Sequence, residues 1–392
     1  MDENEDIIKK FNNLKIKGQY FTKNEILKQK VNDFILNNPK EILEPSFGRG
    51  DLIEKVYNKN IIFDMYEIDS TIIPLKNIEK YGIIKYKDFI KENITKKYNT
   101  IIGNPPFVRT KKGNLYIDFV IKCFELLDDN GELIFIVPSD FFKLTCASVI
   151  LNNMIKSGTF THVYHPNNEK MFENAIIDVI VFRYCKDDSL EKKTEYNGKS
   201  MYINNSNGLI TFSEKLYKNQ IIIKDFFDVY VGLVSGKESV YKNKELGNIE
   251  VMNKENILEK YIYINSFPSQ YEKINDYLNK NKKDLINRKI RKFNDKNWFE
   301  WGAPRNIKNM EKYKDTECIY IYNLTRNDTI AFKGKIMYFG GNLIMLKPKN
   351  GVVVDLTKIV LYLNSNNFKK NFTYSKRFKI GHKNISDSLI DI

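Results

Sequence analysis

The stretch IIGNPPF at residues 101–107 joins an apolar, β-branched run to a stiff polar turn that ends in an aromatic ring. Open α/β sheets bind their ligands at such turns, at the carboxyl ends of their strands. Because Pro105 and Pro106 have no backbone N–H, the turn offers mainly acceptors, namely the Asn104 side-chain oxygen and nearby carbonyls. Two acceptors suit an NH₂ group, and Phe107 offers a face on which a planar ring can stack. The turn therefore predicts a pocket for the amino edge of a nucleobase.

Upstream, the stretch EILEPSFGRGD at residues 41–51 predicts a short strand that runs into a loop containing glycines. Gly48 and Gly50 would let the backbone approach a ligand closely, and residues 52–57 have the apolar spacing of a helix. A strand, a glycine loop and a helix are typical of the start of a βαβ nucleotide site. A pair of glycines alone is a weak signal, which the following strands strengthen.

The next predicted strands also end in polar residues. The strand predicted over residues 61–66 leads to Glu67, whose carboxylate could accept hydrogen bonds from ribose hydroxyls. The strand over residues 83–86 leads to Asp88, which could accept from an adenine amino group, and to Phe89, which could pack on the ring. Each acidic residue alone is more often a solvated loop residue or a helix cap. Together they predict a repeated α/β unit with one shared ligand edge, marked by Glu44, Glu67, Asp88 and Asn104.

The segment GQYFT at residues 18–22 precedes a predicted helix whose apolar side begins at Ile26. Thr22 and Glu25 have the spacing of a capping box, in which both side chains satisfy backbone donors at the helix start. A capped helix N-terminus also binds carboxylates. We therefore expect Thr22 to begin this helix and to hold the carboxylate of an amino-acid-like cofactor.

In this order, the motifs resemble those of the S-adenosylmethionine-dependent DNA adenine N6-methyltransferases of the TaqI-like, or gamma, class. The order matters, because other classes permute the cofactor motif, the catalytic motif and the recognition region. The resemblance covers residues 18–185 well and the remainder loosely, and one departure is Phe107, where many members have tyrosine. The matching segments are 18–22, 44–50, 67–69, 88–89, 104–107, 114–119, 131–139, 171–173 and 179–182.

The resemblance implies an α/β fold: a doubly wound, mixed seven-stranded Rossmann-like methyltransferase domain over residues 1–195. A mixed α+β DNA target-recognition domain would follow over residues 196–392. The implied cofactor is S-adenosyl-L-methionine. The residues expected to hold it are Thr22, Glu44, Ser46, Gly48, Gly50, Glu67, Asp88 and Phe89.

The exocyclic amino nitrogen of adenine is a poor nucleophile, because its lone pair is delocalised into the ring. If Asn104 and the Pro105 carbonyl accept both amino hydrogens, the nitrogen becomes pyramidal and can attack the sulfonium methyl group in line. The base must first be flipped out of the duplex. Phe107 would then stack on one face of it, and Phe172, by resemblance, would close the other face or edge. The expected catalytic residues are Asn104, Pro105, Pro106 and Phe107.

The composition indicates a globular protein with two domains. The 392 residues, of which 42% are hydrophobic, can form one large core and a second one. No apolar run approaches the roughly 20 residues that a membrane span needs. The four cysteines and three histidines fit no metal-ligand spacing, and widely spaced cysteines are typical of free thiols in a reducing compartment. We therefore expect a cytoplasmic protein with no membrane partner and no metal.

Positive charge is concentrated in the second half of the chain. Residues 1–185 contain 26 Lys and Arg against 25 Asp and Glu, whereas residues 186–392 contain 37 against 24. A basic domain favours a polyanion through counterion release, and residues 372–382 alternate aromatic with cationic residues, as nucleic-acid-binding faces often do. Lysine used as solvated surface filler would explain the number of cations but not their asymmetry. We expect double-stranded DNA as the partner and a domain boundary near residues 186–207.

Other functions are compatible with the same motifs. An acceptor pair cannot distinguish one NH₂ group from another, so the substrate could be an RNA base or a protein glutamine. A cofactor-sensing DNA-binding protein without turnover is a further alternative, which the intact turn at residues 104–107 disfavours. We expect a monomeric modification enzyme of a restriction–modification system, with any cognate restriction endonuclease on a separate chain.

Overall fold

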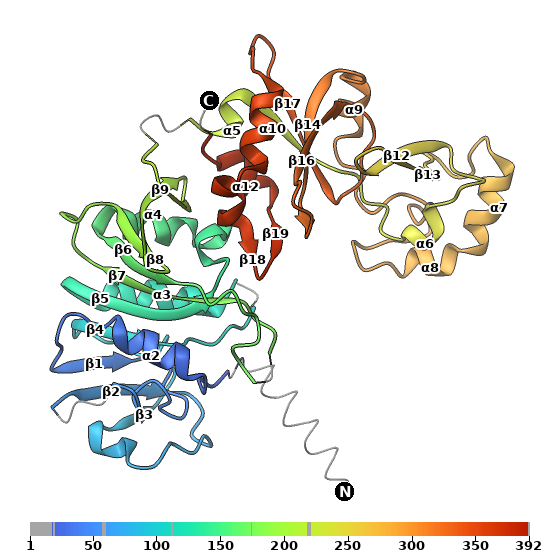
Figure 1. The fold of residues 1–392 in the computed structure, drawn as a ribbon. Helices are drawn as coiled ribbons and strands as arrows, with labels where there is room; N and C mark the ends of the chain where they lie inside the picture. The colour runs from blue at the N-terminus through green and yellow to red at the C-terminus, as the bar shows by residue number, and fades with distance from the viewer. Residues whose placement is uncertain are drawn as a thin grey trace, which may run out of the picture. The chain divides into compact units, whose positions relative to one another are not determined.

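The structure is a computed structural model that describes residues 18, 20–56, 60–110, 113–173, 175–217 and 221–390. The chain divides into two compact units (Figure 1). The first comprises Met1–Asn219 with Tyr374–Lys376, and the second comprises Gln220–Thr373 with Arg377–Ile392.

The first unit is built on a ten-stranded mixed sheet with the order β10-β9-β8-β6-β7-β5-β4-β1-β2-β3 (Figure 1). The five strands from β5 to β3 in this order are mutually parallel, whereas β7 is antiparallel to both β5 and β6. The strands are β1 (Glu41–Glu44), β2 (Ile62–Glu67), β3 (Ile84–Tyr86), β4 (Tyr98–Gly103), β5 (Leu127–Pro138), β6 (Thr159–Tyr164), β7 (Val179–Cys185), β8 (Lys193–Tyr196), β9 (Lys199–Ser206) and β10 (Leu209–Ser213).

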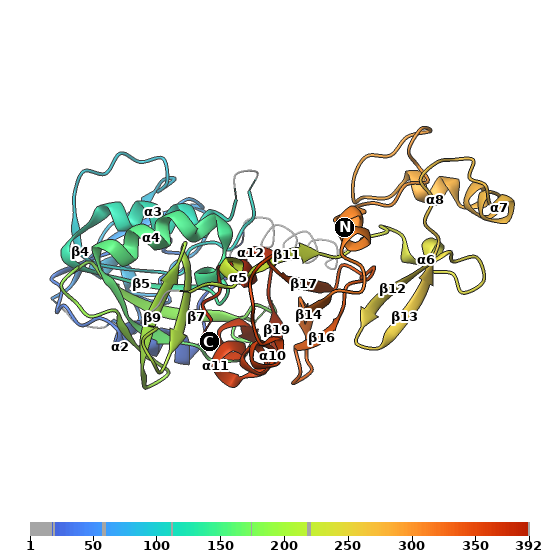
Figure 2. The ribbon, with the colours of Figure 1, turned by 90° about the horizontal axis from the view of Figure 1, so that it is seen from above.

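The sheet is covered by helices on both faces, as the sequence predicts for a doubly wound fold. Successive residues of β4 face different cores: Ile101 packs on the side of α3 (Leu115–Leu126) and α4 (Ser148–Ser157), and Ile102 on the side of α2 (Glu25–Asp33). Figure 2 shows α3 and α4 on the face opposite α2. Because both faces are buried, the central strands are nearly continuous apolar runs. The expected doubly wound, mixed seven-stranded α/β fold is confirmed, and its seven strands are β1–β7.

The remaining three strands extend this sheet beyond the expected domain boundary at residues 195 and 196. Strand β8 ends at Tyr196 and pairs in parallel with β6, and β9 and β10 then continue the sheet in antiparallel pairs. The division between the units therefore lies after β10, at Asn219, rather than at residue 195. The polar stretch around Asn204 and Gly208, which predicts a linker, forms the β9-β10 hairpin instead.

Two local predictions near the start of the chain are wrong. Helix α2 is capped by Asn24, whose Oδ1 accepts from the backbone N–H groups of Ile26 (3.0 Å) and Leu27 (3.2 Å), and not by Thr22. Asparagine is as good an N-cap as threonine, so the helix begins two residues later than a Thr22 cap would place it. Residues 51–55 form turns and Val56 lies in a bend rather than in a helix, although Leu52, Ile53 and Val56 are buried in one core cluster, as the apolar spacing predicts.

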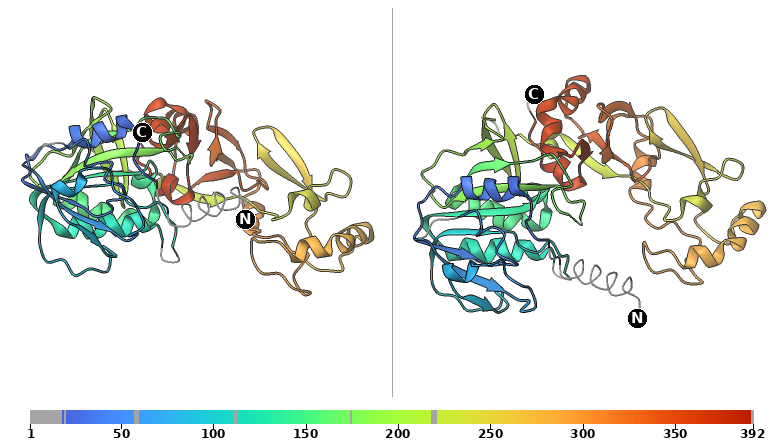
Figure 3. Two further views of the ribbon diagram at one scale, coloured as in Figure 1. Left: turned by 90° about the horizontal axis from the view of Figure 1, so that it is seen from below. Right: turned by 60° about the horizontal axis from the view of Figure 1, so that its bottom comes forward.

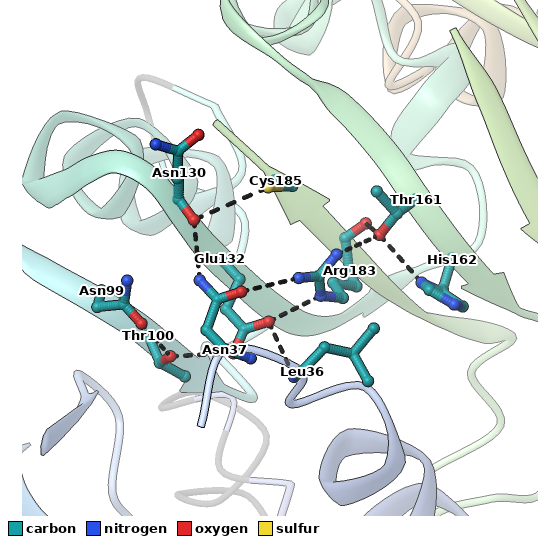
Figure 4. Close-up of polar contacts among 10 residues, drawn as sticks. All are labelled: Leu36, Asn37, Asn99, Thr100, Asn130, Glu132, Thr161, His162, Arg183 and Cys185. Atoms are coloured by element: carbon teal, nitrogen blue, oxygen red, sulfur yellow. Dashed lines mark hydrogen bonds and ion pairs between the residues drawn. The ribbon is translucent and has the colours of Figure 1, made fainter. Parts of the chain in front are cut away.

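A buried polar network ties the segment after α2 to the sheet (Figure 4). The Glu132 carboxylate in β5 is fully buried and accepts from the Nε of Arg183 (2.7 Å), the Oγ1 of Thr100 (3.0 Å) and the backbone N–H groups of Leu36 and Asn37 (both 3.1 Å). Arg183 also donates from Nη2 to Asn37 at 3.1 Å. This network links β4, β5 and β7 to the connection that leads into β1.

The second unit is a mixed α+β structure, in agreement with the expected class. Its main sheet has four antiparallel strands in the order β11-β17-β14-β16, and two smaller sheets have the orders β12-β13 and β15-β19-β18. Figure 3 draws this unit in yellow to red. Its strands are β11 (Phe227–Val231), β12 (Ile249–Lys254), β13 (Ile257–Tyr261), β14 (Glu317–Tyr322), β15 (Leu324–Thr325), β16 (Ala331–Lys335), β17 (Leu343–Pro348), β18 (Thr373–Tyr374) and β19 (Arg377–Lys379).

The helices of the second unit are short. They are α5 (Ile223–Phe226), α6 (Glu238–Tyr241), α7 (Glu272–Lys280), α8 (Lys282–Ile286), α9 (Ile307–Lys312), α10 (Leu356–Asn364), α11 (Asn366–Lys369) and α12 (His382–Asp387). Single 3₁₀ turns occur in the chain at Ile78–Tyr81, Phe141–Lys143, Thr145–Ala147 and Lys370–Phe372. None of the helices in the described residues combines the length and the apolar character that a bilayer crossing requires.

Candidate functional site

A cavity of about 650 Å³ lies at the carboxyl ends of β1, β2, β3 and β4 in the first unit. Strands β1 and β4 are neighbours in the sheet, but the chain runs from β1 to β2 and β3 on one side before it returns to β4 on the other. This is the topological switch point, where open α/β sheets bind ligands. The volume is within the range of about 300–1,000 Å³ that is usual for small-molecule sites.

Most of the residues expected to bind a ligand meet at this cavity. Those that line it are Ser46, Gly48, Glu67, Asp88, Phe89, Asn104 and Pro106. Thr22, Glu44 and Gly50, expected to bind the cofactor, do not line it, and neither do Pro105, Phe107 and Phe172. The sequence analysis did not assign several other lining residues. Lys87, Lys91 and Val108 flank the expected site residues in sequence, whereas Tyr20 and Phe119 reach the cavity from other segments.

Glu44 supports the cavity wall from behind. Its side chain is buried, and its Oε1 accepts from the backbone N–H (3.1 Å) and the hydroxyl (3.3 Å) of Ser46. The Oε2 atom is buried and has no hydrogen-bond partner among the described residues. The pKa of Glu44 is raised to about 8, mainly by burial and also by the neighbouring Glu67, against the opposing effect of the hydrogen bonds from Ser46. Glu44 therefore orients Ser46, which faces the cavity.

Glu67 holds the glycine loop at the end of β2. One of its oxygens accepts from the backbone N–H of Gly48 and the other from that of Asp69, both at 2.8 Å. Burial raises the pKa of the Glu67 carboxyl. Gly48 has a φ of 58°, in the left-handed region that favours glycine. The loop thus needs both the glycine and the carboxylate to keep its shape.

Asp88 and Phe89 form the wall at the end of β3. Asp88 accepts from the backbone N–H of Ile90 at 3.1 Å, and its other oxygen is 2.9 Å from the Nζ of Lys91. The Phe89 ring is buried and stacks on Phe119, with ring centroids 5.6 Å apart. A polar acceptor and an aromatic edge therefore lie together, as recognition of a purine ring requires.

Asn104 forms the corner at the end of β4. Its Nδ2 donates to the carbonyl oxygen of Tyr20 and to the Oγ1 of Thr22, both at 2.9 Å. Its Oδ1 is buried and has no hydrogen-bond partner among the described residues. Buried acceptors are nearly always paired, and an unpaired one costs free energy. Because Asn104 lines the cavity, this oxygen can be satisfied by a ligand that donates a hydrogen bond.

Aromatic rings cluster beside this corner. The centroid of Phe107 lies 6.1 Å from Tyr20, with an angle of 29° between the rings, and 6.2 Å from Phe172, with an angle of 81°. Tyr116 contacts the same ring edge-on at 6.0 Å. The structure thus brings Phe172 next to Phe107, as the resemblance implies. Tyr20 was missed as a member of this cluster, although it lies inside the GQYFT segment that the sequence analysis singled out.

Gly18 allows the two segments to meet. Its φ is 64°, and a Cβ placed there would lie 2.2 Å from the Cγ2 of Val108. Any side chain would therefore push the GQYFT segment away from the turn that follows β4. Gly18 therefore favours the close approach of this segment to the turn that contains Asn104.

Comparisons with known proteins give the same picture for the first half of the chain. Residues 8–172 match the family model described as Eco57I restriction-modification methylase. The type II methyltransferase M.HincII of Haemophilus influenzae is 30% identical over 198 residues, which cover 44% of this chain and 38% of that protein. M.AccI of Acinetobacter calcoaceticus is 26% identical over 195 residues, which cover 42% and 36%. The chain thus spans less than two fifths of the length of these relatives.

A solved structure resembles the whole chain in fold. The type IIL restriction-modification enzyme MmeI, solved in complex with DNA, has a TM-score of 0.59 at 11% identity, and the match covers 98% of this chain and 65% of that one. At this identity the likeness concerns the fold alone. The family match over residues 8–172 and the sequence similarity to M.HincII confirm that this chain is similar to the methyltransferases of restriction–modification systems, as its motifs indicate.

Proposed function

We propose that this chain is a DNA adenine N6-methyltransferase of a restriction–modification system. It transfers a methyl group from S-adenosyl-L-methionine to an adenine that is flipped out of duplex DNA. The observation that carries this proposal is the buried, unpaired Oδ1 of Asn104 at the wall of a cavity at the switch point of the sheet.

The lining residues fit S-adenosyl-L-methionine, which supplies an electrophilic methyl group when it is bound. Asp88 offers a carboxylate beside the Phe89 ring for the adenine end, and Glu67 offers one for the ribose. Ser46 and the backbone at Gly48 lie between these acidic residues and the Asn104 corner. The related family model over residues 8–172 supports the same cofactor.

The turn at Asn104 and Pro105 would activate the target amino group. Asn104 Oδ1 and the Pro105 carbonyl would each accept one amino hydrogen, which favours a pyramidal nitrogen whose lone pair faces the methyl group. Such preorganised acceptors stabilise the transition state without a general base. Phe107 and Phe172 pack edge-on against each other, and Tyr20 lies against Phe107, so these rings must separate to admit a planar base between them. The surplus proton leaves to solvent after the methyl transfer.

Duplex DNA is the substrate that the charge distribution supports. The second unit contains 30 Lys and Arg against 19 Asp and Glu, whereas the first contains 33 against 30. The basic charge of the second unit favours a polyanion over a protein glutamine. A monomeric state and a separate cognate restriction endonuclease are further parts of this proposal.

The direct test is methyl transfer by the purified chain from labelled S-adenosyl-L-methionine to duplex DNA, RNA and total protein, followed by identification of the methylated group. We expect label in duplex DNA as N6-methyladenine. Label in N4-methylcytosine would contradict the choice of adenine, and label only in RNA or protein would contradict the choice of DNA. Absence of transfer to all three would favour a cofactor-sensing protein without turnover.

A further inference from the structure

The side chain of Asn104 is fixed by the segment that precedes α2. Its two amide hydrogens are both used, one by the carbonyl of Tyr20 and one by the hydroxyl oxygen of Thr22, each at a donor–acceptor distance of 2.9 Å. Thr22 is only 3% exposed. It does not line the cavity, so its hydroxyl meets Asn104 behind the cavity wall.

These two contacts determine which way the amide points. A carbonyl oxygen can only accept, so rotation of the Asn104 amide by 180° would place Oδ1 against the Tyr20 oxygen with no hydrogen between them. Only the observed orientation satisfies the Tyr20 and Thr22 oxygens and leaves Oδ1 as the atom without a partner. The Thr22 oxygen also holds the plane of the amide, which a single hydrogen bond to Tyr20 would leave free to tilt.

We propose, on the basis of the function proposed above, that Thr22 is a positioning residue for methyl transfer rather than a residue that holds the cofactor. Its Oγ1 anchors the amide of Asn104, so that Oδ1 is aimed at the amino group of the target base. This role replaces the cofactor contact expected for Thr22 from the sequence. Misplacement of a reacting group by about 1 Å can cost about a hundredfold in rate, so an anchor of this kind affects turnover.

The test compares Thr22→Val, which keeps the shape of the side chain and removes the acceptor, with Thr22→Ser, which keeps the acceptor. We expect Thr22→Val to lower kcat by about tenfold, the scale of one lost hydrogen bond. The affinity for S-adenosylhomocysteine, measured by calorimetry, should not change. Thr22→Ser should restore kcat, because the Oγ still reaches Asn104. Thr22→Ala removes the same acceptor without a methyl group against Asn104, and it provides the same comparison if Thr22→Val does not fold.

Thr100→Val is the matched control. Thr100 is also a buried threonine in the first unit, and its hydroxyl donates to Glu132 at 3.0 Å in the network of Figure 4. The same chemical change there should lower the melting temperature and leave kcat unchanged at temperatures where the protein is folded. A general loss of stability is thereby separated from a loss of positioning.

Three results would overturn the inference while the wild-type chain methylates DNA: weaker S-adenosylhomocysteine binding by Thr22→Val with kcat unchanged, full activity of Thr22→Val, or equal losses for the valine and serine variants. Weaker S-adenosylhomocysteine binding with kcat unchanged would show that Thr22 contacts the cofactor, as the sequence predicts. A wild-type chain that transfers no methyl group to DNA would instead contradict the proposed function itself.

Discussion

Asn104 and Glu44 each have a buried side-chain oxygen without a hydrogen-bond partner among the described residues, but the two atoms have different consequences. Asn104 faces the cavity, so a ligand can satisfy its oxygen. Glu44 lies behind Ser46 and can avoid a buried negative charge by keeping a proton, which its raised pKa favours. Asn104 is therefore expected to bind a ligand, because it lines the cavity, whereas Glu44 does not line it and holds Ser46 in place.

Asn104→Ala removes the acceptor that the proposed mechanism requires. We expect kcat to fall by at least about a hundredfold, the effect of losing one preorganised contact to the transition state. The affinity for S-adenosylhomocysteine, measured by calorimetry, should stay near that of the wild type, because the other cavity walls are unchanged. An unaltered turnover number would show that the target amino group is not held at this corner.

Asp88→Ala tests the opposite end of the cavity. We expect the dissociation constant of S-adenosylhomocysteine to rise by about tenfold, because a carboxylate acceptor for the purine amino group is lost. Asp69→Ala is a comparison at the same rim, since Asp69 lines the cavity at the end of β2 but was not expected to contact the purine. Equal affinity for the wild type and Asp88→Ala would remove Asp88 from the cofactor site.

Glu44→Gln tests the protonation of the buried carboxyl. Burial raises the pKa of Glu44 to about 8 in the folded protein, whereas an unfolded glutamate titrates near pH 4.3. Between these values the unfolded chain releases the proton and the folded chain retains it, so rising pH favours unfolding. We expect the wild-type melting temperature to fall more steeply than that of Glu44→Gln between about pH 5 and pH 8. Parallel curves in this range would contradict the raised pKa.

At the scale of residues, the sequence predicts several of the side chains that the fold brings to the cavity. Asn104–Phe107 and the acidic residues at the ends of β2 and β3 are recognisable because each is contiguous with an apolar strand. Tyr20 and Thr22 were harder to assign. Their roles depend on contacts with Asn104 across more than 80 positions of the chain, which only the folded sheet brings together.

Strands β1, β2, β3 and β4 deliver their polar ends to one edge because they are parallel. These elements are predictable from sequence, since strands that are buried on both faces are apolar throughout. Strands β8 to β10 were not predicted as part of the sheet. They carry polar residues and form short antiparallel pairs, so their sequence is similar to that of a linker.

Arg183→Met tests the network that joins β4, β5 and β7. The Glu132 carboxylate is fully buried. Arg183 is its ion-pair partner in the network of Figure 4, at a distance of 2.7 Å. Removal of one member of a buried pair typically costs about 3–5 kcal/mol. We expect a loss of that size in the free energy of unfolding, measured by denaturant titration.

An exposed ion pair serves as the control for this prediction. Lys30 and Asp33 are 3.2 Å apart, with 36% and 38% of their side-chain surfaces exposed. Lys30→Met should cost at most about 1 kcal/mol, because solvent screens such pairs. Equal effects of Arg183→Met and Lys30→Met would show that the buried network does not stabilise the sheet.

At the scale of the whole molecule, the two units differ in net charge, and this difference is the basis for the proposed DNA binding. The second unit contains 30 Lys and Arg against 19 Asp and Glu, an excess of 11 that the sequence already indicates. The place of the division could not be predicted in the same way, because charge changes gradually along the chain while the sheet ends abruptly after β10.

Binding of DNA should therefore depend strongly on salt. If the second unit contacts six to ten phosphates, affinity for a duplex falls by about 10³–10⁵ between 50 and 200 mM salt. Affinity for S-adenosylhomocysteine should change little, because that cavity lies in the nearly neutral first unit. Fluorescence anisotropy with a labelled duplex measures the first quantity and calorimetry the second. A duplex affinity that is insensitive to salt would contradict a phosphate-binding role for this unit.

The most direct test of the central claim is a structure of the whole chain with sinefungin and a duplex that contains its target site. The account predicts a flipped adenine whose amino nitrogen lies within hydrogen-bond distance, about 2.7–3.2 Å, of both Asn104 Oδ1 and the Pro105 carbonyl oxygen. An adenine that remains stacked in the duplex, or an Asn104 corner without any base beside it, would contradict the account.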